Sequence, residues 1–173
     1  MIKENQLLFA RSKEGAKIPT KRVEDAGYDI YACFEENTLV IPPHTTKMIP
    51  TGIHSACSED YYIQLVERGS TGTKGIAQRC GVIDSGYRNE WFVPITNTTN
   101  KHMIISKLDN EFETYKESFG DIMPESFIYP YSKAICQAVV LPVPKMEVVE
   151  VPLEELQSIK SERGMGALGS SGK

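Results

Sequence analysis

The sequence contains few of the residues that bind metals or carry redox chemistry. Its 173 residues include four cysteines and three histidines, and no two cysteines have the spacing of a CxxC pair. These residues are Cys33, Cys57, Cys80 and Cys136, with His44, His54 and His102. Such scattered positions exclude the usual spacing of a protein-held zinc site, and we expect the thiols to be reduced, as in a cytoplasmic protein.

The chain also lacks a basic excess and a long apolar run. Its formal net charge is −4 at pH 7, whereas nucleic-acid-binding domains usually carry an excess of Lys and Arg. The first eleven residues have no apolar core of the kind found in signal peptides. The apolar stretch "AVVLPVP" is short and is interrupted by Pro142 and Pro144. We therefore expect a cytoplasmic protein that binds neither nucleic acid nor a membrane.

Short runs of alternating apolar and polar residues dominate the chain. A length of 173 residues fits one domain, and 40% hydrophobic with 24% charged residues is typical of a globular protein. Strands are predicted at "YYIQLVERG", "WFVPITN", "AICQAVVLPV" and "KMEVVEVP", with prolines and glycines between the runs. Only "LEELQSIKS" predicts a helix. Many short strands in one chain favour an all-β sandwich, barrel or jelly roll.

Two segments depart from this pattern of short strands. Residues 98–130 are polar, acidic and irregular, and such an insert in a compact domain is either functional or a tolerated surface loop. The last residues, 161–173, read "SERGMGALGSSGK". A Gly/Ser-rich end is either a flexible linker or an arm that becomes ordered when a ligand binds.

Two polar stretches in the first half of the chain are candidates for ligand binding. In "EDAGYDIYA", Asp25 and Asp29 lie on either side of a glycine turn, which alone is a weak signal. In "ERGSTGTKGI", Arg68 ends a predicted strand and a loop of Gly, Ser and Thr follows. A guanidinium beside exposed backbone N–H groups suits a phosphate, although a simple polar turn fits the same residues.

A third stretch, "CGVIDSGYRNEWF", places a carboxylate at the end of an apolar run. Asp84 directly follows Val82 and Ile83, so we expect its side chain to be partly buried, which suits a general base. Tyr87 offers a flat face that can stack on a sugar or a base. The structural interpretation of the same residues is a hairpin with its turn at residues 84–86.

The remaining two stretches are a strand with a polar residue and the C-terminal end itself. In "YSKAICQAVVLP", Gln137 lies inside an apolar strand and needs a hydrogen-bond partner from the protein or from a ligand. In the last stretch, Arg163 is followed by several glycines.

In their order and spacing, the five stretches resemble the five motifs of the trimeric dUTP diphosphatase (dUTPase) family. "DAGYDIYA" resembles the first motif, "RGSTGTKG" the phosphate-binding second, and "GVIDSGYRNE" the third. "AICQAVV" resembles the fourth motif and "RGMGALGSSG" the glycine-rich fifth. The resemblance covers nearly the whole chain apart from residues 98–130, and similar inserts occur in some phage-type members of the family.

The resemblance implies a jelly-roll-like β-barrel that assembles as a homotrimer, with active sites built from more than one subunit. It implies a β domain over residues 1–160, with an insertion at 98–130, followed by a mobile C-terminal arm at 161–173. The implied reaction is the hydrolysis of dUTP to dUMP and pyrophosphate. Mg²⁺ would be carried by the triphosphate without a direct protein ligand, and Asp29 is a candidate contact through water.

The resemblance also assigns roles to individual residues. Asp84 would activate the water that attacks the α-phosphorus, and Tyr87 would pack on the deoxyribose and exclude a 2′-OH. Arg163 would grip the γ-phosphate, while Leu168 and Gly169 would cover the base. The substrate-binding residues implied in this way are Arg68, Gly69, Ser70, Gln78, Val82, Ile83, Tyr87, Gln137, Arg163, Leu168, Gly169 and Ser170.

The sequence departs from the family pattern at several positions. Gly69 stands where the family usually has Ser, and Leu168 replaces the aromatic residue that stacks on uracil. Tyr131-Ser132-Lys133 stands in place of a Gly-Asp-Arg type turn. Two alternatives stay open: a nucleotide enzyme of the dCTP deaminase type, and a dUTP-responsive regulatory protein that binds a protein partner through residues 98–130.

Overall fold

The computed structural model describes residues 2–3, 5–79, 81–108, 125–164 and 166. The chain divides into two compact units, Met1–Val143 and Pro144–Lys173, and each is described by itself. Among the described residues, no helix has the length and apolar character needed to cross a membrane.

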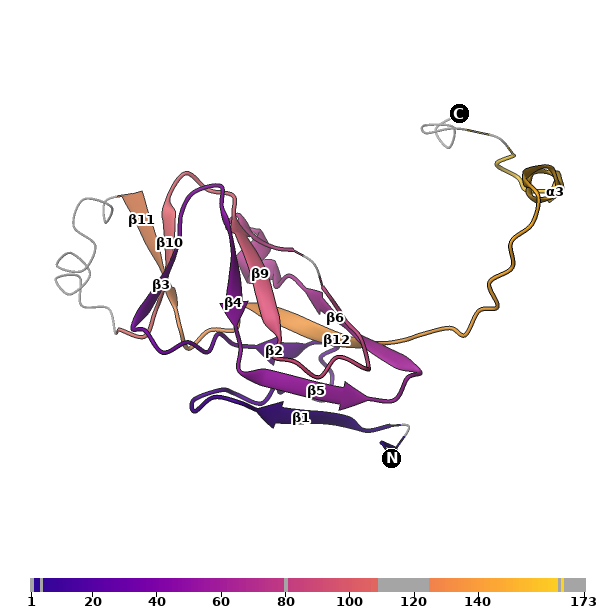
Figure 1. Cartoon of the computed structure of the whole chain (residues 1–173). Helices are drawn as coiled ribbons and strands as arrows, with labels where there is room; N and C mark the ends of the chain where they lie inside the picture. Colours follow the sequence, from indigo (N-terminus) through magenta and orange to yellow (C-terminus); the bar gives the residue numbers. More distant parts are fainter. Residues whose placement is uncertain (1, 4, 80, 109–124, 165, 167–173) are drawn as a thin grey trace. The chain divides into compact units, whose positions relative to one another are not determined.

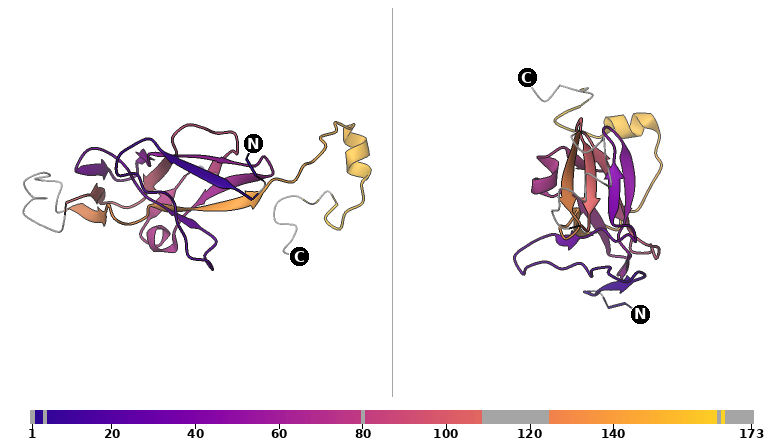
Figure 2. Two further views of the ribbon diagram at one scale, coloured as in Figure 1. Left: turned by 90° about the horizontal axis from the view of Figure 1, so that it is seen from below. Right: turned by 90° about the vertical axis from the view of Figure 1, so that its left-hand side faces the viewer.

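The first unit consists of short strands in four small sheets, drawn in Figures 1 and 2. The largest sheet has the order β2 (Tyr28–Ile30), β12 (Cys136–Pro142), β6 (Tyr61–Val66), β8 (Val82–Ile83), and all its pairs are antiparallel. A two-stranded sheet pairs β1 (Leu7–Arg11) with β5 (Ile53–Cys57). Another sheet has the order β4 (Thr46–Pro50), β9 (Phe92–Asn97), β7 (Ile76–Gln78).

The fourth sheet contains the one parallel strand pair of the described residues. Its order is β11 (Ser126–Pro130), β10 (His102–Ser106), β3 (Thr38–Ile41). β10 runs parallel to β11 and antiparallel to β3. Parallel neighbours need a long connection, and the 19 residues between these two strands, 107–125, are long enough for one.

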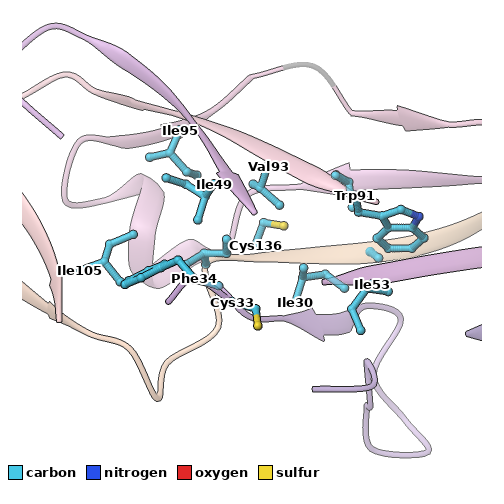
Figure 3. Packing of buried hydrophobic residues seen from close by; sticks show 14 of the residues in the cluster. Ile30, Cys33, Phe34, Ile49, Ile53, Trp91, Val93, Ile95, Ile105 and Cys136 are labelled. Carbon is cyan, nitrogen blue, oxygen red and sulfur yellow. The ribbon is translucent and has the colours of Figure 1, made fainter. Parts of the chain in front are cut away.

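One hydrophobic core lies between these sheets, and each strand from β2 to β12 contributes at least one buried side chain to it. Figure 3 shows several of these side chains converging between the ribbons, among them Ile30, Ile49, Val93 and the ring of Trp91. Trp91 and Val93 are fully buried. The all-β prediction is therefore confirmed, and most of the core consists of the β-branched residues that suit a pleated surface.

The predicted alternation is observed in two central strands. In β6, Ile63 and Leu65 are buried while the intervening residues are half-buried. Trp91, Val93 and Ile95 are all buried at or before β9, as the period of two predicts, although Pro94 between the last two is buried as well. The predicted helix also forms, as α3 (Leu153–Ser158) of the second unit, and none of its residues is buried.

One predicted strand is absent from the chain as described. The run from Lys145 to Pro152 is extended but belongs to no strand, and Met146 and Val148 are 79% and 95% exposed. Alternation alone cannot make a strand, because a strand needs a hydrogen-bonded neighbour. No described strand forms a β-ladder with this run.

The segment 98–130 is not irregular throughout, so that prediction is wrong at both ends. β10 and β11 lie inside the segment, and Met103 and Ile105 of β10 belong to the core. Local sequence hides this, because β10 pairs with β3, which lies some sixty residues earlier. Residues 109–124 lie outside the described residues, so the insertion and its binding role stay predictions.

The turn at residues 84–86 forms, but the predicted hairpin does not. The backbone N–H of Tyr87 donates to the Asp84 carbonyl at 3.0 Å, which closes the turn. β8 before the turn pairs with β6, whereas β9 after it pairs with β4 and β7. The turn therefore carries the chain from one sheet to another.

Candidate active site

Three of the five stretches meet at one end of the four-stranded sheet. Gln137 of β12 lies opposite Asp29 of β2 on one side and opposite Val66 of β6 on the other. Arg68 follows Val66 by two residues. The strand register therefore brings the first, second and fourth stretches into one row.

A cleft of about 760 Å³ lies over this row. Its lining includes Thr20, Lys21, Gly27, Asp29, Arg68 and Gln137. The structure thus brings together three residues that the sequence singled out for ligand binding: Asp29, Arg68 and Gln137. Cationic, amide and carboxylate groups in one cleft are suited to a polar anionic ligand.

The Arg68 guanidinium is fixed from two sides. Its Nε lies 3.4 Å from Oδ1 of Asp29, and its Nη1 donates to the Ala134 carbonyl at 3.0 Å. Oδ1 of Asp29 is buried and accepts no hydrogen bond from the described residues, so the ion pair is its only polar contact there. A planar group held in this way keeps further N–H donors in a fixed direction, which suits a phosphate.

Gln137 supplies a polar group without a protein partner. Its side-chain amide makes no hydrogen bond to any described residue, although it lines the cleft. A Cβ atom on Gly27 would lie 3.0 Å from the Gln137 Cβ, so a glycine at position 27 allows the two strands to pack closely here. The described residues therefore do not supply the hydrogen-bond partner that the sequence predicted for Gln137, whose half-buried amide faces the cleft.

The residues after Arg68 form a single helical turn, α1 (Gly69–Gly72), where a loop was predicted. The backbone N–H groups of Thr71 and Gly72 both donate to the Arg68 carbonyl at 3.0 Å, and Thr71 Oγ1 donates to it at 2.9 Å. These local bonds explain the turn in a stretch whose glycines disfavour helix. Gly69 and Ser70 are exposed in its first turn.

The third stretch lies elsewhere on the chain. Ile83 is buried, whereas Val82 is 60% exposed and Asp84 is also exposed. The predicted partial burial of Asp84 is therefore wrong for the single chain, because the alternation along β8 puts it on the outward face with Val82. Tyr87 is 37% exposed, and its hydroxyl donates to the Glu90 carbonyl at 3.0 Å.

Asp84 and Arg68 lie near opposite ends of β6. Val82 pairs with Gln64 and Ile83 with Ile63, so Asp84 is level with residue 62. Arg68 lies six residues further along the chain, two past the end of β6, which is a distance of about 20 Å at the rise of extended backbone. The two groups therefore cannot act on one phosphorus atom within a single chain.

Gln78 occupies a third position, at the end of β7. Its backbone N–H donates to the Glu67 carboxylate at 3.0 Å, and its side-chain amide donates to the Arg79 carbonyl at 2.9 Å. Gln78 is not among the residues that line the cleft with Arg68.

The cleft also contains cationic residues that the sequence analysis missed. Lys21 donates to the Asp25 carbonyl at 2.7 Å, and Arg22 binds the Asp25 carboxylate through two bonds of 2.8 and 3.0 Å. The hydrogen bond from Arg22 lowers the pKa of Asp25 below its usual value. The charged run "KRVE" directly before the first motif was the available signal.

A buried thiol underlies the cleft. Cys136 precedes Gln137 in β12 and is fully buried. Burial raises the pKa of the Cys136 thiol to about 12, so the thiol stays neutral at physiological pH. Among the described residues there is no group of three or more His, Cys, Asp or Glu side chains that could hold a metal ion.

The C-terminal candidates belong to the second unit or lie outside the described residues. Nε of Arg163 donates to the Gly166 carbonyl at 3.2 Å, and Gly164 has a φ of 56°. Leu168, Gly169 and Ser170 lie outside the described residues.

The dUTPase family model matches residues 13–110, which is more than half of the chain. The deoxyuridine 5'-triphosphate nucleotidohydrolase of Nautilia profundicola is 30% identical over 97% of this chain and 99% of its own length. The enzyme of the same name from Debaryomyces hansenii is 32% identical over 96% of this chain and 86% of its own. The chain therefore belongs to the dUTPase family.

Solved structures agree with this assignment at the level of the fold. The dUTPase of Staphylococcus bacteriophage 80alpha, solved with dUPNHPP, has a TM-score of 0.72 and 24% identity over 98% of this chain and 99% of that one. The EIAV dUTPase has a TM-score of 0.60 and 20% identity over 86% and 98%. The predicted jelly-roll-like fold is confirmed.

Proposed function

We propose that this chain hydrolyses dUTP to dUMP and pyrophosphate. The observation that supports it most directly is the Arg68 guanidinium, fixed by Asp29 and Ala134 in a cleft beside the unpartnered amide of Gln137. The chain belongs to the dUTPase family, and relatives that match nearly its full length are named deoxyuridine 5'-triphosphate nucleotidohydrolases. No observation favours the dCTP deaminase alternative.

In this proposal the cleft receives the phosphates. Arg68 donates to phosphate oxygens with the N–H groups that Asp29 and Ala134 leave free, and the Gln137 amide donates beside it. Lys21 adds positive charge at the rim of the same cleft. Gly69 and Ser70 approach the phosphates from the first turn of α1, where a small residue at position 69 leaves room for the ligand.

Asp84 is the proposed general base. It accepts a proton from water as the water oxygen forms a bond to the α-phosphorus and the bond to the departing pyrophosphate breaks. Because Asp84 is exposed, water reaches it freely in the single chain. Tyr87, tethered through its hydroxyl to Glu90, forms a wall against the deoxyribose, while Val82, Ile83 and Gln78 lie toward the uracil.

The distance between Asp84 and Arg68 supports a site that two chains complete. A homotrimer provides this, because in a ring each subunit presents one surface to the next. The second unit also exposes apolar side chains that an assembly can cover, including Met146, Val148, Leu153 and Ile159.

Mg²⁺ fits this site as an ion carried by the triphosphate. The polar groups of the cleft include one carboxylate oxygen, Oδ1 of Asp29, that lacks a hydrogen bond, and such an oxygen suits a water-mediated contact to a hard cation. Bound to the triphosphate, Mg²⁺ would neutralise phosphate charge.

The glycine-rich arm completes the proposal. Arg163 contacts the γ-phosphate, Leu168 and Gly169 cover the base, and Ser170 is a further substrate-binding residue. The role of the arm, like the cytoplasmic location of the protein, stays a prediction.

The test is a pyrophosphate-release assay with Mg²⁺ across the deoxynucleotides and UTP. We expect turnover of dUTP above all others, and Asp84→Asn lowers kcat by about 10²–10⁴-fold because it removes only the base. Glu36→Gln, which neutralises an exposed carboxylate in another part of the chain, is the control. Parent-like turnover by Asp84→Asn contradicts the assignment of the base, and release of ammonia from dCTP supports a deaminase instead.

A further inference from the structure

One carbonyl near the phosphate cleft holds two side chains at once. The Tyr129 hydroxyl of β11 donates to the Ala134 carbonyl at 2.6 Å. Nη1 of Arg68 donates to the same carbonyl at 3.0 Å. A carbonyl oxygen has two lone pairs and can accept both bonds, so Tyr129 and Arg68 share one acceptor.

This carbonyl belongs to the connection between β11 and β12, which replaces the turn usual in the family. The backbone N–H of Lys133 donates to the Pro130 carbonyl at 3.0 Å, and that of Ile135 donates to the Ile30 carbonyl at 2.8 Å. Between these two anchors, the Tyr129 hydroxyl is the side-chain contact besides Arg68 that restrains the Ala134 carbonyl.

The Tyr129 hydroxyl is well suited to this task. The residue is 6% exposed, so its hydroxyl would be left buried without a hydrogen bond if the carbonyl turned away, which is unfavourable. Burial raises the pKa of Tyr129 above its usual value, although the nearby positive charge of Arg68 opposes this. The hydroxyl therefore stays a proton donor across the physiological range.

We propose that Tyr129 is a positioning residue of the phosphate cleft, whose hydroxyl orients the Ala134 carbonyl and through it the Arg68 guanidinium. The sheet of β3, β10 and β11 is then part of the support of the site, although it contributes no residue to the lining of the cleft. This inference rests on the proposed function, in which Arg68 binds phosphate.

The consequence for binding follows from the geometry of the guanidinium. Asp29 holds Arg68 through Nε, and the Ala134 carbonyl holds it through Nη1, which together fix the plane of the group. Without the second anchor the plane can rotate about the first. Bidentate hydrogen bonding to a phosphate depends on the orientation of that plane. We therefore expect the loss of the second anchor to lower the affinity for phosphate while contacts to uracil and sugar persist.

The first experiment compares Tyr129→Phe with the parent chain by calorimetry. The probes are a non-hydrolysable imido analogue of dUTP and deoxyuridine, which has no phosphate. We expect the analogue to bind about 3–10-fold more weakly, as for the loss of one neutral hydrogen bond, while deoxyuridine affinity is unchanged. Parent-like affinity for the analogue, or an equal loss for both probes, overturns the proposal.

Tyr131→Phe is the matched control from the same connection. The Tyr131 ring packs against Phe34 at 5.1 Å and lies near Lys107, and its hydroxyl does not contact the Ala134 carbonyl. The Tyr131→Phe substitution removes a tyrosine hydroxyl two residues from Tyr129 and leaves the hydrogen bonds to the Ala134 carbonyl intact. If Tyr131→Phe weakens the analogue as much as Tyr129→Phe does, the effect belongs to the connection as a whole and the proposal fails.

A double-mutant cycle separates this proposal from the proposed function. Arg68→Lys keeps the positive charge but removes the planar guanidinium that the Ala134 carbonyl orients. Adding Tyr129→Phe to Arg68→Lys should therefore change the affinity for the analogue by less than about twofold. The same four proteins are unfolded in urea without nucleotide. If the parent binds no analogue, the proposed function fails, yet non-additive urea midpoints still support the Tyr129–Arg68 link. Additive midpoints overturn it.

Discussion

The Glu90 carboxylate joins three parts of the chain that are distant in sequence. Its Oε1 accepts hydrogen bonds of 2.8 Å from the Lys13 ammonium and from the backbone N–H of Gly52. The Glu90 carbonyl accepts the Tyr87 hydroxyl. The segment that follows Asp84 is therefore tied to residues near β1 and β5, so a residue outside the cleft helps to fix the proposed wall against the sugar.

Glu90 should make the stability of the protein depend on pH. Burial disfavours the charged form and is the largest single influence, but the bonds from Lys13 and Gly52 together outweigh it and lower the pKa of Glu90. A carboxyl whose pKa is lower in the folded state stabilises above its unfolded pKa. That stabilisation is lost as the pH falls through the folded pKa.

We therefore expect Glu90→Gln to lower the free energy of unfolding by about 1 kcal/mol at pH 7. The difference from the parent should shrink as the pH falls below about 4.5, the usual pKa of a glutamate side chain. Urea unfolding between pH 7 and pH 3 measures it, with Glu36→Gln as the exposed control. A difference that stays constant over this range contradicts the assignment.

At the scale of residues, the sequence predicted the members of the cleft better than their supports. Asp29, Arg68 and Gln137 stand in recognisable motifs, and the register brings them together. The sequence did not predict the supporting roles of Tyr129 and Glu90, because these roles depend on partners that are distant in the chain. The bond from Arg68 to Ala134 spans 66 residues and that from Lys13 to Glu90 spans 77, and no local pattern encodes such pairs.

Among the elements, β8 depends on a glycine for its position. A Cβ atom on Gly81 would lie 2.4 Å from Nε2 of Gln64 and 2.7 Å from the Leu65 carbonyl oxygen. The Leu65 N–H donates to the Gly81 carbonyl at 2.7 Å, so the two backbones are in direct contact. No side chain fits at this position unless β8 moves away from β6, and Asp84 follows three residues later.

Gly81→Ala should lower the free energy of unfolding by about 1–3 kcal/mol, because the added methyl group overpacks the contact between β6 and β8. It should also reduce dUTP turnover, since a shift of β8 displaces Asp84. Gly86→Ala is the matched control, because nothing lies within 4 Å of a Cβ atom at that position. Equal urea midpoints for the two variants would count against the packing argument.

Alternation predicted individual strands well and their neighbours poorly. The buried positions of β6 and β9 follow from the sequence. The same pattern at Lys145–Pro152 gives no strand, since no described strand forms a β-ladder with it. In contrast, β10 lies in a segment whose composition is mostly polar. Pairing is a property of two segments, so the pattern of one segment does not determine it.

For the molecule as a whole, removal of the arm should separate stability from turnover. Cutting the chain after Glu162 removes little apolar surface, so the thermal midpoint and the oligomeric state should be nearly unchanged. Turnover should fall sharply, because Arg163 and the glycine backbone no longer close over the triphosphate and exclude water. Arg163→Ala should reproduce much of the loss and Lys160→Ala should not. A truncated chain with full activity contradicts the proposed role of the arm.

The assembly itself is tested by mixing two inactive variants. Arg68→Ala removes the proposed phosphate contact and Asp84→Asn the proposed base, and these residues lie about 20 Å apart along β6 in one chain. If neighbouring subunits supply them to a shared site, a mixed trimer contains sites with Arg68 from one chain and Asp84 from the other. Random mixing in equal amounts should restore about one quarter of the parent turnover, since each wild-type residue is present with a probability of one half.

The variants are denatured together and refolded, with dUTP hydrolysis and light scattering as readouts. Each variant refolded alone is the control. A trimer that recovers no activity on mixing would show that both groups act within one chain, which the length of β6 opposes, and a monomeric mass at micromolar concentration would exclude the shared site altogether.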